Sequence, residues 1–117
     1  MAHSYVDAND LELQHGTMRR VRAELGVRTF GINQFELAPN QSGYEHDESE
    51  SNQDEVYVIL AGSGRMTVGG DEVELKPGRY VHVTAEETRN LHSGSEGLTW
   101  IAVGAPQETP YHPKGFF

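Results

Sequence analysis

The chain has 117 residues, the length of one domain. It carries 18 Asp and Glu against 9 Lys and Arg, a formal net charge of −9. Such an acidic chain is repelled by phosphate backbones and anionic lipid, so we expect neither a nucleic-acid nor a membrane partner. The absence of cysteine excludes disulfides, thiolate catalysis and zinc sites built on sulfur. The longest apolar run, residues 56–61, is too short for a transmembrane helix, and residues 1–10 lack a signal-peptide pattern. We therefore expect a small cytoplasmic domain.

The N-terminal quarter of the chain gives a mixed signal. Residues 1–17 are polar and are expected to form an N-terminal arm on the surface. Segment 18–26 then places Met18, Val21 and Leu25 close to helical spacing and ends at Gly26, the residue type that commonly terminates a helix. The same segment also alternates apolar and polar residues, so a short N-terminal helix and a strand both remain open.

From residue 29 onward the pattern becomes one of short strands separated by turn residues. The expected strands are 30–37, 55–61, 65–68, 72–75, 79–83, 89–92 and 97–104. Gly62-Ser63-Gly64 is expected to end one strand, and Gly69-Gly70-Asp71 is a strong hairpin signal. Short, regularly spaced strands predict an all-β sandwich or barrel.

No repeat or long linker divides the chain, so we expect one domain over residues 1–117. The barrel core is expected at 29–104. The Pro-rich C-terminal tail, 105–117, is expected to pack its aromatic residues against the barrel or a neighbouring subunit.

Two segments resemble the cupin superfamily, in particular its small single-domain members of the cupin-2 conserved-barrel type. In the first segment, 43–62, Gly62 follows Glu55 by seven positions within the phrase QDEVYVILAGSG. In the second, 70–81, a turn and a strand lead into Pro77-Gly78. The resemblance implies an all-β double-stranded β-helix, or jelly-roll, barrel.

The same resemblance implies a candidate metal site. In metal-binding cupins, two His and one Glu of the first motif join a His of the second motif on one divalent ion. His46 matches the first of these positions, Glu48 stands at the second His position, and Glu55 matches the Glu. Arg89 stands where the last His is expected, and a guanidinium has no lone pair to give a metal. The alternatives are an Fe, Mn, Ni or Zn site on His46, Glu48 and Glu55, and a metal-free Arg89–Glu55 pair.

A ligand pocket is expected beside this pair. Tyr57 lies two positions after Glu55 and so shares its face of the strand. Arg89 could capture a ligand carboxylate with its two-pronged guanidinium. Trp100 is interpreted either as core or as pocket wall. His92 is expected on the opposite face from Arg89, and the facing of His82 stays open.

Three functions follow as alternatives. The main one is a small cupin with a small-molecule pocket in the barrel and an undetermined activity. The second is a metal-dependent enzyme of the dioxygenase or isomerase type that uses His46, Glu48 and Glu55. The third is a non-catalytic accessory module. We expect a homodimer, because exposed barrel edges need cover.

Overall fold

The computed structural model describes residues 2–115. Its elements are η1 (Ala8–Asp10), β1 (Met18–Arg19), α1 (Val21–Leu25), β2 (Gly31–Leu37), β3 (Gln53–Val68), β4 (Asp71–Leu75), β5 (Tyr80–Val83) and β6 (Arg89–Pro106). The all-β prediction is confirmed. Among the described residues, no helix has the length and apolar character needed to cross a membrane.

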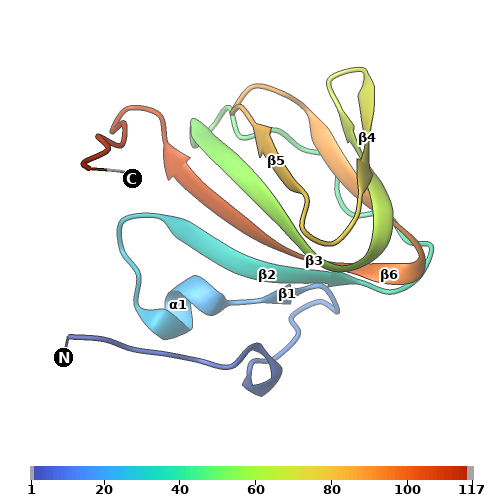
Figure 1. The fold of residues 1–117 in the computed structure, drawn as a ribbon, viewed down its shortest axis with the longest axis horizontal. Coiled ribbons are helices and arrows are strands. Elements are labelled where there is room, and N and C mark those ends of the chain that lie inside the picture. Colours follow the sequence, from blue (N-terminus) through green and yellow to red (C-terminus); the bar gives the residue numbers. More distant parts are fainter. Residues whose placement is uncertain (1, 116–117) are drawn as a thin grey trace.

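All strand pairs are antiparallel and belong to one sheet. Its order is β1-β2-β6-β3-β4, and β5 adds to β3. The two long strands, β3 and β6, curve through the whole molecule, with β1 and β2 on one side of them and β4 and β5 on the other (Figure 1). This curvature rolls the sheet into a jelly-roll barrel with an interior lined by the inward faces of both halves.

The predicted break at residues 62–64 is wrong. These residues lie within the continuous strand β3, where the register with β6 shifts between Ile59 and Ala61 and again between Gly62 and Gly64. Gly62 has a φ of +88°, and a Cβ there would collide with the carbonyl of Gly97. The glycines therefore produce bulges that bend the strand, and not a turn that ends it. Segments 89–92 and 97–104 are likewise parts of one strand, β6.

Segment 18–26 contains both of the structures that its pattern left open. Residues 18–19 pair with β2, and the helix α1 follows over residues 21–25. Gly26 ends the helix with a left-handed φ of 79°, and its N–H donates to the carbonyl of Arg22. The Arg19 guanidinium ties this segment to β2 through a 2.6 Å ion pair with Glu36.

The core lies between the two halves of the rolled sheet. Alternate residues of each strand point inward, as the period of two along a strand requires. The buried cluster consists of Leu37, Tyr57, Ile59, Met66, Leu75, Val83, Leu91, Leu98 and Trp100. In the tail, Tyr111 is 68% exposed, and the predicted packing of Phe116 and Phe117 lies outside the described residues.

Candidate functional site

The rolled sheet brings together residues from opposite ends of its longest strand pair. Glu55 lies near the start of β3, whereas Arg89 pairs with Val68 at the other end of that strand. Curvature of the sheet places the Arg89 guanidinium 2.9 Å from Glu55 Oε1 across the barrel interior. Tyr57 points to the same side as Glu55 because the two residues are separated by one position in a strand.

These three side chains form a closed hydrogen-bond network. The Tyr57 hydroxyl donates to Glu55 Oε1 at 2.6 Å and accepts from Arg89 Nε at 3.1 Å. The remaining terminal nitrogen of Arg89, Nη1, donates to the carbonyls of Thr84 and Glu87 at 3.2 and 2.6 Å. The Arg89 side chain has no exposed surface. Its charge is therefore buried, but it is compensated by Glu55 and by well-placed oxygen acceptors.

The network holds both Tyr57 and Arg89 in their protonated forms. Burial of Tyr57, together with the negative charge of Glu55, raises the pKa of the phenol well above its usual value. Burial by itself lowers the pKa of Arg89, but hydrogen bonds and charge from Tyr57 and Glu55 outweigh it, and the net shift is upward. The phenol therefore stays a hydrogen-bond donor to Glu55 at neutral pH.

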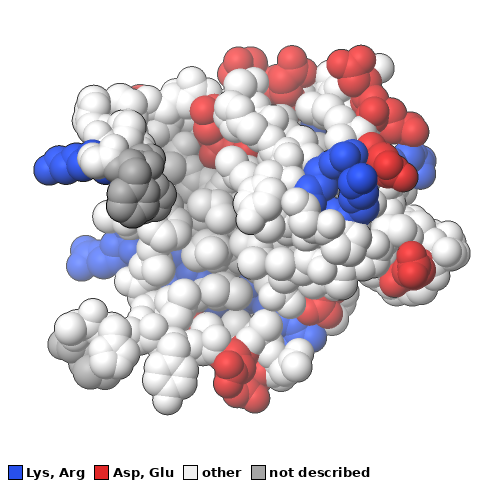
Figure 2. Space-filling view, in the orientation of Figure 1, with Lys and Arg blue, Asp and Glu red and all other residues white. Residues whose placement is uncertain are grey.

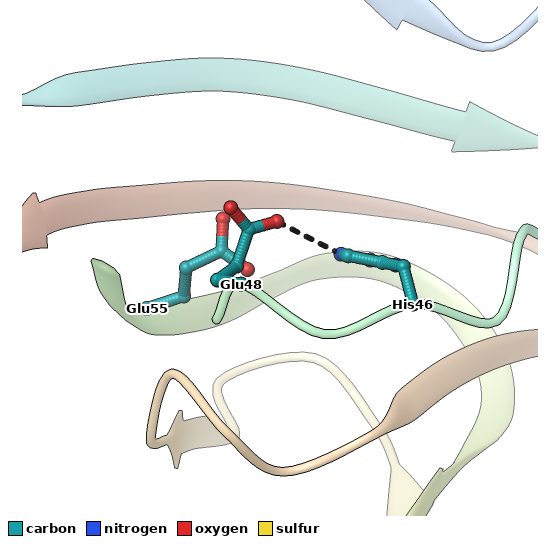
Figure 3. A group of neighbouring side chains, drawn as sticks. All are labelled: His46, Glu48 and Glu55. Atoms are coloured by element: carbon teal, nitrogen blue, oxygen red, sulfur yellow. Dashed lines mark ion pairs between the residues drawn. The ribbon is translucent and has the colours of Figure 1, made fainter. Parts of the chain in front are cut away.

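The loop before β3 adds His46 and Glu48 to the site. Two backbone hydrogen bonds, of 3.0 and 2.8 Å, fix His46 against Arg89. The His46 ring then lies 3.3 Å from Glu48 Oε2, while Ser51 donates to Glu48 Oε1 at 2.8 Å. Each of His46, Glu48 and Glu55 offers one possible metal-ligand atom, and these three atoms lie within 4.8 Å of one another (Figure 3).

This donor set fits a divalent transition metal with three protein ligands. One imidazole and two carboxylates are ligands that iron, manganese or zinc accepts, with open positions left over. The His46 and Glu48 side chains are 40% and 23% exposed, so an ion would have access from solvent. Arg89 lowers the affinity of such a site, because its cation already lies against one oxygen of Glu55.

A cavity of about 380 Å³ opens beside Glu55. Its described lining residues are His15, Thr17, Phe35, Leu37, Gln41, Ser42, Gly43, Tyr44, His46, Glu55, Tyr57, Asn90, Leu91, Trp100 and Ala102. Arg89 is not among them and lies behind Glu55 and Tyr57. Because its nitrogens are occupied by this network, Arg89 presents no free face for the expected capture of a ligand carboxylate.

Two buried polar atoms of cavity-lining residues lack partners among the described residues. They are the indole nitrogen of Trp100 and the side-chain oxygen of Asn90. Trp100 is 5% exposed and stacks on Phe35 with ring centroids 5.4 Å apart. Both atoms are fully buried and neither is open to the cavity, so they are unsatisfied polar groups within its packed wall.

Sequence reasoning did not include Phe35, Tyr44 or Asn90 in the pocket. Phe35 lies directly opposite Trp100 in the β2–β6 register, a pairing that no local pattern gives. The other histidines lie outside the group of donors. His92 contacts Ser42 and Thr67 at 2.8 and 3.2 Å, and the exposed His82 pairs with Asp54 at 3.3 Å.

Comparison with known proteins decides the family. Residues 33–104 match the family model described as the cupin domain. The chain belongs to the cupin family. An uncharacterized protein of Streptomyces coelicolor is 35% identical to this cupin over 57 residues, which are 49% of the chain and 54% of the relative. The chain thus matches about half the length of that curated relative.

Solved structures resemble this cupin in fold. A cupin protein from Bacteroides fragilis has a TM-score of 0.82 at 14% identity, over 97% of this chain and 92% of that one. A cupin 2 conserved barrel domain protein from Salinispora arenicola reaches 0.72 at 18% identity, with 92% and 91% covered. A protein from Thermotoga maritima described as a predicted oxalate decarboxylase also reaches 0.72, at 19% identity, with 88% and 99% covered.

Proposed function

We propose that this cupin binds a small molecule in its barrel cavity, with Glu55 and Tyr57 as polar contacts and Trp100 as an apolar wall. The cavity of about 380 Å³ beside Glu55 carries the proposal. Its volume falls within the range of about 300–1,000 Å³ that is usual for ligand sites.

Arg89 and Tyr57 have positioning roles in this proposal. Both bind the same oxygen of Glu55, Oε1, and thereby fix the carboxylate. Among the described residues, no hydrogen bond reaches the second oxygen, Oε2. This second oxygen is the one that we assign to ligand contact.

The chain provides its own reporter for a binding test, because Trp100 is its only tryptophan. A library of small metabolites is screened by the intrinsic fluorescence of the protein, and hits are titrated against Glu55→Gln. We expect saturable changes that weaken about tenfold or more in this variant, since a contact with a charged group is lost. Glu72→Gln, the same change on exposed β4, serves as the control and should bind normally. A complete absence of saturable changes would overturn the proposal.

A second candidate function is favoured by the close approach of His46, Glu48 and Glu55. These residues would hold an iron, manganese, nickel or zinc ion. The ion would supply Lewis-acid chemistry of the kind that a dioxygenase or isomerase uses. The chain's own residues would orient the substrate against the aromatic wall formed by Phe35 and Trp100.

Metal content of the untagged protein tests this second candidate. We expect about one ion per chain in the unmodified protein, and its loss in His46→Ala, if the three donors form the site. His82→Ala removes an exposed histidine outside the donor group and should leave the metal content unchanged. Protein that holds no metal, and takes up none when soaked with these ions, would exclude the metal site.

A further inference from the structure

We infer that the molecule held in the barrel is an organic cation: an ammonium group on an apolar body. This inference rests on the proposed small-molecule function and names its ligand class. The geometry points away from a ligand carboxylate, which the position of Arg89 in the sequence had favoured.

The charge around the cavity is the first argument. Among its described lining residues, Glu55 is the one acidic side chain, and there is no Lys or Arg. Arg89 is fully buried behind the wall and faces Glu55, Tyr57 and two carbonyls. It balances one carboxylate, and Glu48 brings a second carboxylate whose donor atom lies within 4.8 Å of that of Glu55. Because Glu55 lines the cavity and Arg89 does not, the carboxylate acts on a ligand at shorter range than the guanidinium, so an anion is repelled here and a cation is attracted.

The aromatic lining is the second and independent argument. Phe35, Tyr44, Tyr57 and Trp100 all line the cavity. Phe35 and Trp100 are nearly parallel, with an angle of 11° between their planes. The faces of aromatic rings carry a negative electrostatic potential, and Trp binds cations best among them. An acidic group beside several aromatic rings is the arrangement that recognises an ammonium ion attached to an apolar body.

Three probes with the same body separate the contribution of charge from that of shape. These are 2-phenoxyethylamine, 2-phenoxyethanol and phenoxyacetate, which at neutral pH are a cation, a neutral molecule and an anion. Each is titrated into the protein with EDTA present, so that no metal ion competes at the carboxylates. Trp100 fluorescence and the single indole N–H resonance of the protein report binding at the cavity wall.

We expect the amine to bind about tenfold more tightly than the alcohol, and phenoxyacetate to bind most weakly, as a charged contact in a partly desolvated site predicts. Glu48→Gln and Glu55→Gln should remove most of the preference for the amine while leaving the affinity for the alcohol within about twofold. Glu72→Gln should retain the full preference. Glu48 is partly exposed and makes no hydrogen bond or ion pair with Arg89 among the described residues, so the Glu48→Gln result tests the inference if Glu55→Gln fails to fold.

The outcomes distinguish this inference from the function on which it rests. If the alcohol or phenoxyacetate binds as tightly as the amine, the cavity is a ligand site but the inference of a cation is wrong. If Glu48→Gln and Glu55→Gln both keep the preference for the amine, the carboxylates do not cause it, and the inference is also overturned. If neither these probes nor the metabolite library perturb Trp100, both proposals fail together.

Discussion

At the scale of single residues, the central feature is a buried arginine, Arg89, at the position where the resemblance to metal-binding cupins implies a histidine. Arg89 is compensated through Glu55, Tyr57 and two carbonyl groups. Removal of one partner from such a buried pair leaves the other as an uncompensated buried charge. The loss in free energy of unfolding is then larger than the net stability that the intact pair contributes. The network therefore makes Arg89 a structural requirement as well as the residue that positions Glu55.

Substitution of Arg89 tests this requirement. We expect Arg89→Met to lower the free energy of unfolding by about 3 kcal/mol, because Glu55 and Tyr57 lose a buried donor. The measurement is urea denaturation followed by Trp100 fluorescence. Arg65→Met, which breaks an exposed pair with Glu72, is the matched control and should change stability by less than about 1 kcal/mol. Equal effects of the two substitutions would contradict the buried network.

Tyr57 gives the network a pH signature. Its pKa is raised in the folded state by burial and by the charge of Glu55, so the folded protein holds the phenolic proton more tightly than the unfolded chain. The resulting stability is fully present below about pH 10, the usual pKa of tyrosine, and is lost as the pH rises above that value. Urea denaturation at several pH values between about 8 and 11 should show a steeper loss of stability for the unmodified protein than for Tyr57→Phe. Parallel curves would show that Tyr57 does not titrate differently in the two states.

At the scale of elements, the two long strands decide the architecture. β3 has 16 residues and β6 has 18, and the register shifts near Gly62 and Gly64 allow β3 to bend. A bulge with a positive φ favours glycine, because other residues adopt that conformation at a cost. The bend carries the two ends of the strand pair toward each other, which is how Arg89 reaches Glu55.

Gly62→Ala tests the bend. Gly62 has a φ of +88°, and an added Cβ would meet the backbone of Gly97, so we expect a loss of about 3 kcal/mol in the free energy of unfolding. Gly70→Ala is the control, since nothing lies within 4 Å of its added Cβ and its φ is not positive. Thermal and urea denaturation of both variants provide the comparison. An equal cost for the two substitutions would show that the bulge does not depend on glycine.

At the scale of the whole molecule, charge and apolar surface are unevenly distributed. Acidic side chains gather over the end of the molecule that holds β4 and β5, while basic side chains are scattered (Figure 2). On the outside of the sheet, Tyr80 pairs with Val58, and both Tyr80 and Leu60 are exposed. Exposed apolar side chains on neighbouring strands are a common feature of surfaces that bind another protein.

The homodimer stays a prediction at this scale. We expect light scattering on a sizing column to give about twice the mass of one chain at micromolar concentration, since dimers with twofold symmetry are the commonest assemblies. Tyr80→Glu should shift the population toward monomer if Tyr80 and Leu60 lie in the contact, whereas Tyr44→Glu, at an exposed tyrosine in the loop before β3, should not. A monomeric mass for the unmodified protein at every concentration would contradict the prediction, and with it a function as a dimeric accessory module.

The sequence by itself determined the fold class and the identity of the polar residues at the site. Three local features can be recognised without any tertiary information. They are the short alternating strands, the hairpin at Gly69-Gly70 and the cupin-like spacing of Glu55 and Gly62. The alternation of a strand was also sufficient to place Tyr57 beside Glu55, and His92 opposite Arg89.

Only the tertiary structure decided which side chains meet at the candidate site. The roll of the sheet turns the glycine pair at 62–64 from an apparent turn into bulges. It also places Phe35 on Trp100 and buries Arg89 behind the cavity wall. These relations join residues far apart in the chain, and they depend on register and curvature. A local pattern predicts which face of a strand a side chain lies on, but not which distant side chain it contacts there. The contact of Arg89 with Glu55 is such a long-range contact, and it assigns Arg89 to holding Glu55 in place and not to binding a ligand directly.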